Sequence, residues 1–359
     1  MNYKRKIFAI SVLLVAVSLF NSGFCQDTVS NRKPVNPNIS VEAEALLDLL
    51  YNISGKYILA GHHNGINTPD RFNEEVKQVT GKYPVVWGCD FSFNFMGNDP
   101  DVIRQQMIDK AIELHSKGYI ITLMWHSCFP TEGDSCSPKT IWIWDDIIPQ
   151  EQWIELTTEG TELNNKWRAQ ADNVAKYLRQ LQEAHVPVLW RPYHEMNGVW
   201  FWWCQHPGED GFARLWKMMY DYFTNHHQLN NLLWVWDANA PRDRKNDEAY
   251  AYKDYFPGTD YVDVLASDVY HNDFRQSHHD ELLEVAAGKP VSLGEVGQMP
   301  TPELLDQQPR WTWFMGWAEW LHKANTPEAV RNLYNSPRTI TLDEISIDDS
   351  GRYVIHPAY

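Results

Sequence analysis

Short apolar runs alternate along the chain with longer segments in which apolar residues recur at helical spacing. The run 186–193 is apolar in its first half and then reaches Arg191, which is typical of a buried strand that ends at a polar edge. In the segment 164–184 one face is apolar, through Trp167, Val174, Tyr177, Leu178 and Leu181. Because these steps are of three and four residues, the segment is predicted to be an amphipathic helix.

The same alternation predicts the fold class. Strands are expected at 57–61, 85–91, 119–125, 186–193, 232–237, 262–269, 291–294 and 312–315, and helices at 101–117, 164–184, 210–227, 281–287 and 302–308. Repeated strand-then-helix units of the α/β class predict a single (β/α)8 TIM barrel, with the helices outside. A doubly wound open sheet has the same alternation, but the Gly-rich phosphate-binding turn that would favour it does not follow the first strand.

The first residues, 1–25, have the layout of a secretory signal peptide. A basic start precedes an apolar run at 7–20, which is short for a membrane span, and small polar residues follow. We predict cleavage near Cys25, export to the periplasm or the medium, a polar N-terminal segment at 26–40 and the barrel at 41–359. Lipid anchoring of Cys25 is the alternative, although the preceding Ser-Gly-Phe matches such processing poorly.

The charge of the chain narrows the choice of partners. The formal net charge is −16, and loss of the segment 1–25 would take it to −19, because that segment holds three cations and no acid. Such a surface repels nucleic acid, anionic lipid and polyanionic polysaccharides, so we expect a neutral ligand, no nucleic acid and no membrane insertion. The 17 tryptophans suit the C–H faces of a neutral sugar polymer, and they also serve as core residues.

Four cysteines remain after the predicted cleavage: Cys89, Cys128, Cys136 and Cys204. An even number in an exported protein permits disulfides, and three pairings are possible. We expect a disulfide between Cys128 and Cys136, which would close one short loop, with the other two cysteines left as thiols.

Polar and aromatic residues gather where the predicted strands end, which in a TIM barrel is the rim that carries active sites. They are His62, His63, Asp90, His126, His194, Glu195, Asp237, Asp268, Tyr270, Glu295, Trp317 and Glu319. Glu195 ends the fourth strand and Glu295 the seventh, so their carboxyl groups can converge over the barrel mouth. Glycoside hydrolysis needs one protonated and one ionised carboxyl group; a gap of about 5 Å gives retention and one of roughly 6.5–9.5 Å gives inversion. A structural alternative pairs Glu195 with Arg191 in a salt bridge.

The stretch 191–203, Arg-Pro-Tyr-His-Glu-Met-Asn-Gly-Val-Trp-Phe-Trp-Trp, closely resembles the acid/base signature of glycoside hydrolase family 26, whose best-known members are β-1,4-mannanases. The resemblance covers most of the chain and implies a retaining barrel glycosidase without a cofactor or a metal. It implies that Glu195 is the acid/base and that Glu295, in Ser-Leu-Gly-Glu-Val-Gly, is the nucleophile. Tyr270 is then placed to donate a hydrogen bond to Glu295 and to keep it ionised.

The resemblance also implies substrate contacts. His126 matches a substrate-contacting histidine of the family, and His194 stands where related barrel glycosidases usually have Asn; each could instead be a structural histidine. Trp200 resembles a ring at the subsite where the bond is cleaved, and Trp317 resembles an aromatic floor from the last strand. We expect the long segment 127–147 to form a wall or aromatic platform at the glycone end, favouring short products such as mannobiose.

These observations lead us to expect an exported, retaining endo-β-1,4-mannanase that acts on mannan, galactomannan or glucomannan. Relatives with this signature can instead cleave mixed-linkage β-glucan or β-1,3-xylan. A metal-dependent barrel hydrolase is an alternative, but His62 and His63 are adjacent, whereas metal barrels often separate two such histidines by one residue. A non-catalytic glycan-binding protein would share the tryptophans but would not need two matched carboxylates. The tail 335–359 carries no assignment.

Overall fold

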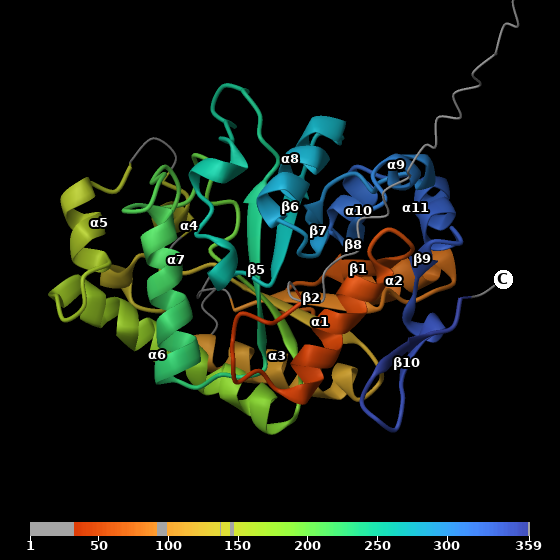
Figure 1. The fold of residues 1–359 in the computed structure, drawn as a ribbon, viewed down its shortest axis with the longest axis horizontal. Helices are drawn as coiled ribbons and strands as arrows, with labels where there is room; N and C mark the ends of the chain where they lie inside the picture. Colours follow the sequence, from red (N-terminus) through yellow and green to blue (C-terminus); the bar gives the residue numbers. More distant parts are fainter. Residues whose placement is uncertain (1–31, 92–98, 137, 144–146, 358–359) are drawn as a thin grey trace, which may run out of the picture.

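The chain forms a closed barrel of eight parallel strands with helices around it (Figure 1). The computed structural model describes residues 32–91, 99–136, 138–143 and 147–357. The barrel strands are β1 Ile58–His63, β2 Val86–Asp90, β3 Ile120–Trp125, β4 Val188–Pro192, β5 Leu232–Asn239, β6 Val264–Val269, β7 Val291–Val296 and β8 Trp311–Gly316. Each strand pairs with the next, and β8 pairs with β1, with Leu59 opposite Trp313. The predicted TIM barrel is therefore confirmed.

Each predicted strand overlaps a barrel strand, with differences at the ends. β4 begins at Val188, later than predicted, and ends at Pro192, because proline has no N–H for the ladder. β5 continues to Asn239, past the predicted end at 237. β7 continues to Val296, so the carboxylate of Glu295 belongs to the strand itself.

The helices of the described chain are α1 Val41–Ile53, α2 Arg71–Thr80, α3 Pro100–His115, α4 Pro138–Ile141, α5 Gln150–Leu156, α6 Glu162–Glu183, α7 Phe212–Asp221, α8 Gln276–Ala286, α9 Pro302–Gln307, α10 Trp320–Lys323 and α11 Pro327–Tyr334. The predicted helix 210–227 is wrong as a single α-helix, because α7 passes into a π-helical turn at Tyr222–His226. α8 begins before the predicted start at 281, since buried His278 and His279 extend its packed face.

Side chains along each strand alternate between two apolar layers. In β5, Leu233 and Val235 belong to the layer inside the barrel, which α1 closes at the end where the strands begin. Trp234 and Trp236 of the same strand pack outward, and Trp234 lies edge-on to Trp216 of α7. This period of two, with both faces buried, explains why the strands read as continuous apolar runs.

The described part of the tail 335–359, which carried no assignment, packs at the end of the barrel where the strands begin. β9 Thr339–Ile340 pairs with the start of β1, and β10 Ile345–Ile347 forms a hairpin with β11 Tyr353–Ile355 beside α1.

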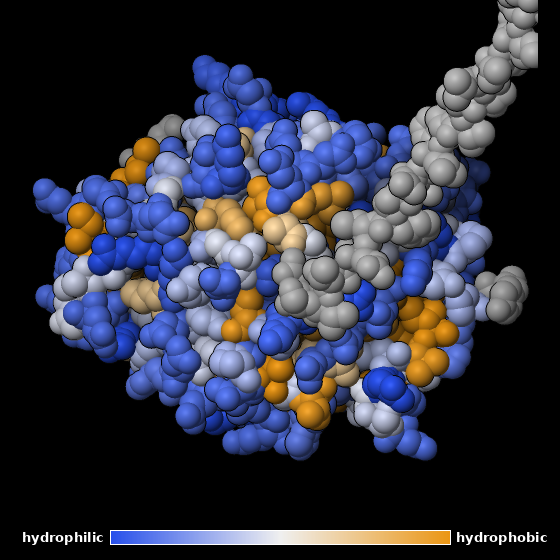
Figure 2. All heavy atoms as spheres, viewed as in Figure 1, coloured by the Kyte–Doolittle hydropathy of each residue, from blue (hydrophilic) through white to orange (hydrophobic). Residues whose placement is uncertain are grey.

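The face of the molecule shown in Figure 2 is mostly hydrophilic, with separate apolar patches. No helix in the described ranges is long and apolar enough to cross a membrane.

The predicted disulfide between Cys128 and Cys136 is confirmed, with the two Cα atoms 5.9 Å apart. Cys89 and Cys204 are free and buried, as expected. The predicted signal peptide, 1–25, lies outside the described residues, so its cleavage and the exported location stay predictions.

Candidate active site

A cleft opens at the carboxyl ends of the strands and brings together the predicted site residues. Its walls are His126, Trp142, His194, Glu195, Trp200, Phe201, Arg242, Asp247, Tyr270, His271, Glu295, Trp317 and Trp320. All seven residues predicted from the sequence to act in catalysis or substrate binding are in this group. The prediction that the carboxyl groups of Glu195 and Glu295 converge over the barrel mouth is therefore confirmed.

Glu295 is held by two donors at its two oxygens. The Arg191 guanidinium lies 3.2 Å from Oε1, and the Tyr270 hydroxyl donates to Oε2 at 2.8 Å, so the predicted Tyr270 hydrogen bond is confirmed. Burial raises the pKa of Glu295, while the Arg191 charge and the Tyr270 hydrogen bond act against that rise. His194 Nε2 is 3.8 Å from Oε1. These contacts favour the ionised form of this carboxyl group.

Glu195 is held by neutral donors. The Asn239 amide donates to Oε1, and the Trp200 indole N–H donates to Oε2 at 2.8 Å. Burial, followed by the negative charge of Glu295, raises the pKa of Glu195 to about 7. Arg242 opposes this shift but does not cancel it. Near neutral pH, this carboxyl group can therefore hold a proton and release it.

The turn after β4 presents Glu195 in a strained backbone conformation. Tyr193 and Glu195 have φ angles of 49° and 54°, a left-handed region that costs non-glycine residues on the order of 1–3 kcal/mol each. The Glu195 amide donates to the Asp237 carbonyl at 2.7 Å, and the Glu195 carbonyl accepts from Gly198 at 2.9 Å. The first hydrogen bond ties the turn to β5, and both hold the strained backbone of Glu195 in place.

Arg191 is the centre of a buried ionic network below the cleft. Its Nη1 contacts Asp237 and lies 3.6 Å from Asp268, and its Nη2 reaches Glu295. The interpretation that paired Arg191 with Glu195 is wrong, because the β4 side chain points into the barrel toward β5, β6 and β7. Gly294 is required beside this network, since a Cβ at that position would lie 2.2 Å from an Asp237 oxygen.

Two of the histidines that line the cleft, His126 and His194, have pKa values shifted in opposite directions. His126 Nδ1 is 2.8 Å from Asp90 Oδ2; burial lowers the pKa of His126, but the charge and hydrogen bond of Asp90 outweigh this and raise it overall. His194 lies edge-on to His126 at 4.6 Å, and burial, with the charges of His126 and Arg191, holds its pKa well below the ordinary value. His194 in its neutral form therefore adds no positive charge beside Glu295.

Aromatic rings line the cleft on opposite sides. Trp317 follows β8 and stacks on His63 with ring centroids 4.0 Å apart, so His63 supports the ring. Trp142 comes from the segment 127–147 and forms an isolated bridge with Phe201. The part of this segment that the structure describes therefore contributes one aromatic ring, Trp142, to the lining of the cleft, while its second tryptophan, Trp144, lies outside the described residues.

Sequence reasoning missed the residues that hold Glu195 from the β5 side. Asn239 lies beyond the predicted end of its strand, although its alternation with Asp237 could have indicated an inward-facing position. Arg242 contacts the Asn239 side chain, bonds Asp247 Oδ1 at 2.5 Å and lies 5.3 Å from the Trp200 ring. Arg242 therefore braces both donors of Glu195, a relation that depends on loop geometry.

Among the described residues, one group of potential metal ligands lies at the base of the cleft: His194 and Glu295, which line it, and Asp268, which is buried below it. The two carboxylates of this group, Asp268 and Glu295, already face the Arg191 guanidinium. The arrangement supplies a permanent positive charge from a side chain between the acids, and it leaves Tyr270 and Arg191 on the oxygens of Glu295. It suits an ionised nucleophile and a separate proton donor.

Known proteins share this arrangement of elements. The family model described as glycosyl hydrolase family 26 matches residues 35–344. A mannan endo-1,4-β-mannosidase of Thermothelomyces thermophilus is 32% identical over 332 residues, which are 88% of this chain and 64% of that protein. The chain therefore spans slightly less than two thirds of that curated relative.

Solved structures agree with the sequence comparison. The structure of GH26A from Muricauda sp. MAR_2010_75 is 48% identical, with a TM-score of 0.83 over 87% of this chain and 99% of that chain. The Podospora anserina GH26-CBM35 β-(1,4)-mannanase is 29% identical, with a TM-score of 0.72 over 88% of this chain and 69% of that chain.

Proposed function

Because this chain belongs to glycoside hydrolase family 26, we propose that it is an endo-acting β-1,4-mannanase that retains anomeric configuration. The observation that carries the proposal is the pair of buried carboxyl groups with opposite partners, Glu295 on Arg191 and Tyr270, and Glu195 on Asn239 and Trp200. The names of the relatives support the choice of mannan.

In the first step, an oxygen of Glu295 attacks the anomeric carbon while Glu195 gives its proton to the leaving glycosidic oxygen. The C–O bond to the leaving sugar breaks as the ester bond to Glu295 forms. The ester is neutral, so Glu195, now ionised, loses a nearby negative charge and its pKa falls. Glu195 then accepts a proton from water, which attacks the anomeric carbon and releases Glu295.

The cleft suits a neutral sugar chain. Trp200, Trp317 and Trp142 offer aromatic faces for the C–H surfaces of the rings. His126 and His194 are proposed to bind hydroxyl groups of the sugar at the cleavage site. We propose that the wall containing Trp142 blocks the glycone end, so that short products such as mannobiose are released, and that the enzyme acts in the periplasm or the medium.

A product time course by chromatography on unsubstituted β-1,4-mannan tests the proposal, with mixed-linkage β-glucan and β-1,3-xylan in parallel. An early ladder of manno-oligosaccharides is the expected result, and early mannobiose would support the blocked glycone end. Products from β-glucan or β-1,3-xylan alone would keep the mechanism and change the substrate. Silence on all three would contradict an endo-glycanase.

Treatment with a chelator distinguishes the proposed mechanism from that of a metal-dependent hydrolase. Since Arg191 supplies the positive charge among the buried acids, EDTA followed by desalting is expected to leave the mannan rate within about twofold. Loss of activity that Zn²⁺ restores would favour the metal-dependent alternative at His194, Asp268 and Glu295.

A further inference from the structure

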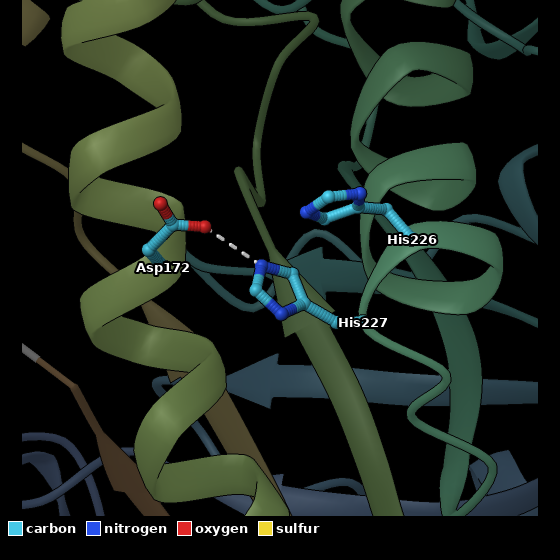
Figure 3. Close-up of side chains that lie close together, drawn as sticks. All are labelled: Asp172, His226 and His227. Atoms are coloured by element: carbon cyan, nitrogen blue, oxygen red, sulfur yellow. Dashed lines mark hydrogen bonds and ion pairs between the residues drawn. The ribbon is translucent and has the colours of Figure 1, made fainter.

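A second group of metal-binding side chains lies in the outer helical layer, and none of its members lines the active-site cleft as the structure describes it. Asp172 belongs to α6, and His226 and His227 lie at the end of the π-helical turn that follows α7. Figure 3 shows the two imidazole rings directed from the turn toward the Asp172 carboxylate across the gap between the helices.

The π-helical turn accounts for this orientation. α7 ends at Asp221, and the amide of His227 donates to the carbonyl of Tyr222, five residues earlier. A wider turn changes the direction of the following side chains relative to a regular helix, and such turns are frequent at functional sites. Here it places two consecutive histidines toward the same carboxylate on a neighbouring helix.

The atoms are close enough to share one ion. One ligand atom from each of the three residues lies within 4.8 Å of the other two, and His227 Nε2 is 2.8 Å from Asp172 Oδ1. A tetrahedral ion with bonds of about 2.0–2.1 Å separates its ligand atoms by roughly 3.4 Å. His226 is exposed and stacks on Tyr222 with ring centroids 4.6 Å apart, so its side chain is free to rotate toward an ion. The Asp172–His227 pair would open from 2.8 Å to the ligand spacing as both atoms bind the ion.

From this geometry we propose that Asp172, His226 and His227 form a binding site for Zn²⁺ or a similar transition-metal ion, separate from the active site. Two imidazole nitrogens and one carboxylate oxygen are the ligand set of zinc, whereas Ca²⁺ and Mg²⁺ require mainly oxygen ligands. The fourth position is open to water. The bound ion would connect α6 to the end of the α7 segment and stabilise the folded chain.

Neighbouring groups set the conditions for binding. The Tyr222 hydroxyl donates to Asp172 Oδ1 at 2.6 Å and fixes that carboxylate. Arg168 lies over the Tyr222 ring, and Arg179 bonds the His227 carbonyl. These two positive charges weaken the attraction for a cation, so we expect weaker binding than at the same ligand set without them.

Calorimetric titration of the untagged full chain with Zn²⁺ tests the proposal, with Ca²⁺ as a second titrant. We expect saturable binding of one Zn²⁺ per chain that His226→Ala removes, and no heat from Ca²⁺. Saturating Zn²⁺ should raise the melting temperature of the wild type by about 2–4 °C and leave His226→Ala unchanged. His226 is the preferred position because its removal deletes only an exposed ring.

His185→Ala is the matched control, because His185 also pairs with a carboxylate, Glu42, at 2.9 Å but has no second histidine in that pair. It should bind Zn²⁺ as the wild type does. Absence of saturable Zn²⁺ binding, or binding that persists unchanged in both His226→Ala and Asp172→Asn, would overturn the site. Hydrolysis of mannan by these variants should match the wild type, which keeps the result independent of the proposed function.

Discussion

The two carboxyl groups of the cleft lie in contrasting surroundings, although both are buried at the ends of barrel strands. Glu295 faces a full positive charge, since the Arg191 guanidinium is 3.2 Å away, and it also accepts from Tyr270. Glu195 accepts from two neutral groups, the Asn239 amide and the Trp200 indole. Hydrogen bonds from charged donors are about twice as strong as those between neutral groups, so the ionised state is favoured more at Glu295.

The backbone is also held differently at the two glutamates. Glu295 lies within β7, where neighbouring strands fix its position. Glu195 lies on a turn with a positive φ angle and depends on β5 for support. Together the contrasts distinguish Glu295, a fixed carboxyl group whose partners favour the ionised form, from Glu195, which lies on a turn and has its pKa raised to about 7. Removing each group or its support should therefore produce a different defect.

The largest effect is expected from Glu295→Ala. Without the carboxylate no ester can form, so turnover on mannan should fall by about 10⁴-fold or more, a barrier increase of about 5.5 kcal/mol. Substrate binding should be largely retained, because the aromatic walls of the cleft remain. Steady-state rates with calorimetry of mannohexaose binding measure both parts. Hydrolysis near the wild-type rate would remove Glu295 from the mechanism.

A smaller and more selective loss is expected from Glu195→Ala. Turnover on mannan should fall by about 10²–10⁴-fold, the usual contribution of a general acid. On an aryl mannobioside whose leaving group needs no proton, the first step should be much less affected, and azide should restore turnover because it attacks without a base. Equal losses on both substrates, with no rescue, would contradict the acid/base role.

The fold and the two carboxylates were predictable because each depends on local sequence. Apolar runs marked the eight strands, and the polar residue after each run marked the rim. The network of Arg191 was not predictable in this way, because its partners Asp237, Asp268 and Glu295 belong to three other strands. Which of them faces the guanidinium depends on strand register and barrel closure.

Two other features escaped sequence reasoning for different physical reasons. Asn239 is the last residue of a strand whose predicted end is two residues too early, and Arg242 lies just beyond it, so the residues that support Glu195 fell outside the predicted strand. The π-helical turn at Tyr222–His226 keeps the apolar spacing of a helix, and nothing in the pattern indicates the wider hydrogen bond. The arrangement of Asp172 with the two histidines is therefore visible only in three dimensions.

Tyr270→Phe tests the support of Glu295 alone. The tyrosine hydroxyl stabilises the charged carboxylate, so its removal should raise the pKa of Glu295 and move the acidic limb of the kcat/KM profile to higher pH. We expect kcat to fall by roughly 10–100-fold with a small change in KM. Tyr250→Phe is the control, since Tyr250 is 44% exposed and lies outside the walls of the cleft. An acidic limb that stays in place would show that Arg191 alone sets the charge of Glu295.

The smallest effect is expected from Arg242→Gln, which alters the support of Glu195. The Arg242 charge lowers the pKa of Glu195, and Arg242 also braces Asn239 and Trp200, whose hydrogen bonds favour the ionised form. Loss of Arg242 should therefore raise the pKa of Glu195 from about 7 and move the alkaline limb of the kcat/KM profile upward.

We expect kcat of Arg242→Gln at neutral pH to fall by less than about tenfold, because the carboxyl group itself remains. Arg244→Gln is the matched control: it lies in the same loop and removes the same charge, but Arg244 is 59% exposed and lies 3.9 Å from Asp247. Its alkaline limb should stay near that of the wild type. Equal shifts in both variants would mean that the general field of the loop acts on Glu195, whereas a shift in Arg242→Gln alone would assign the effect to Arg242 itself, through its charge and its bracing of Asn239 and Trp200.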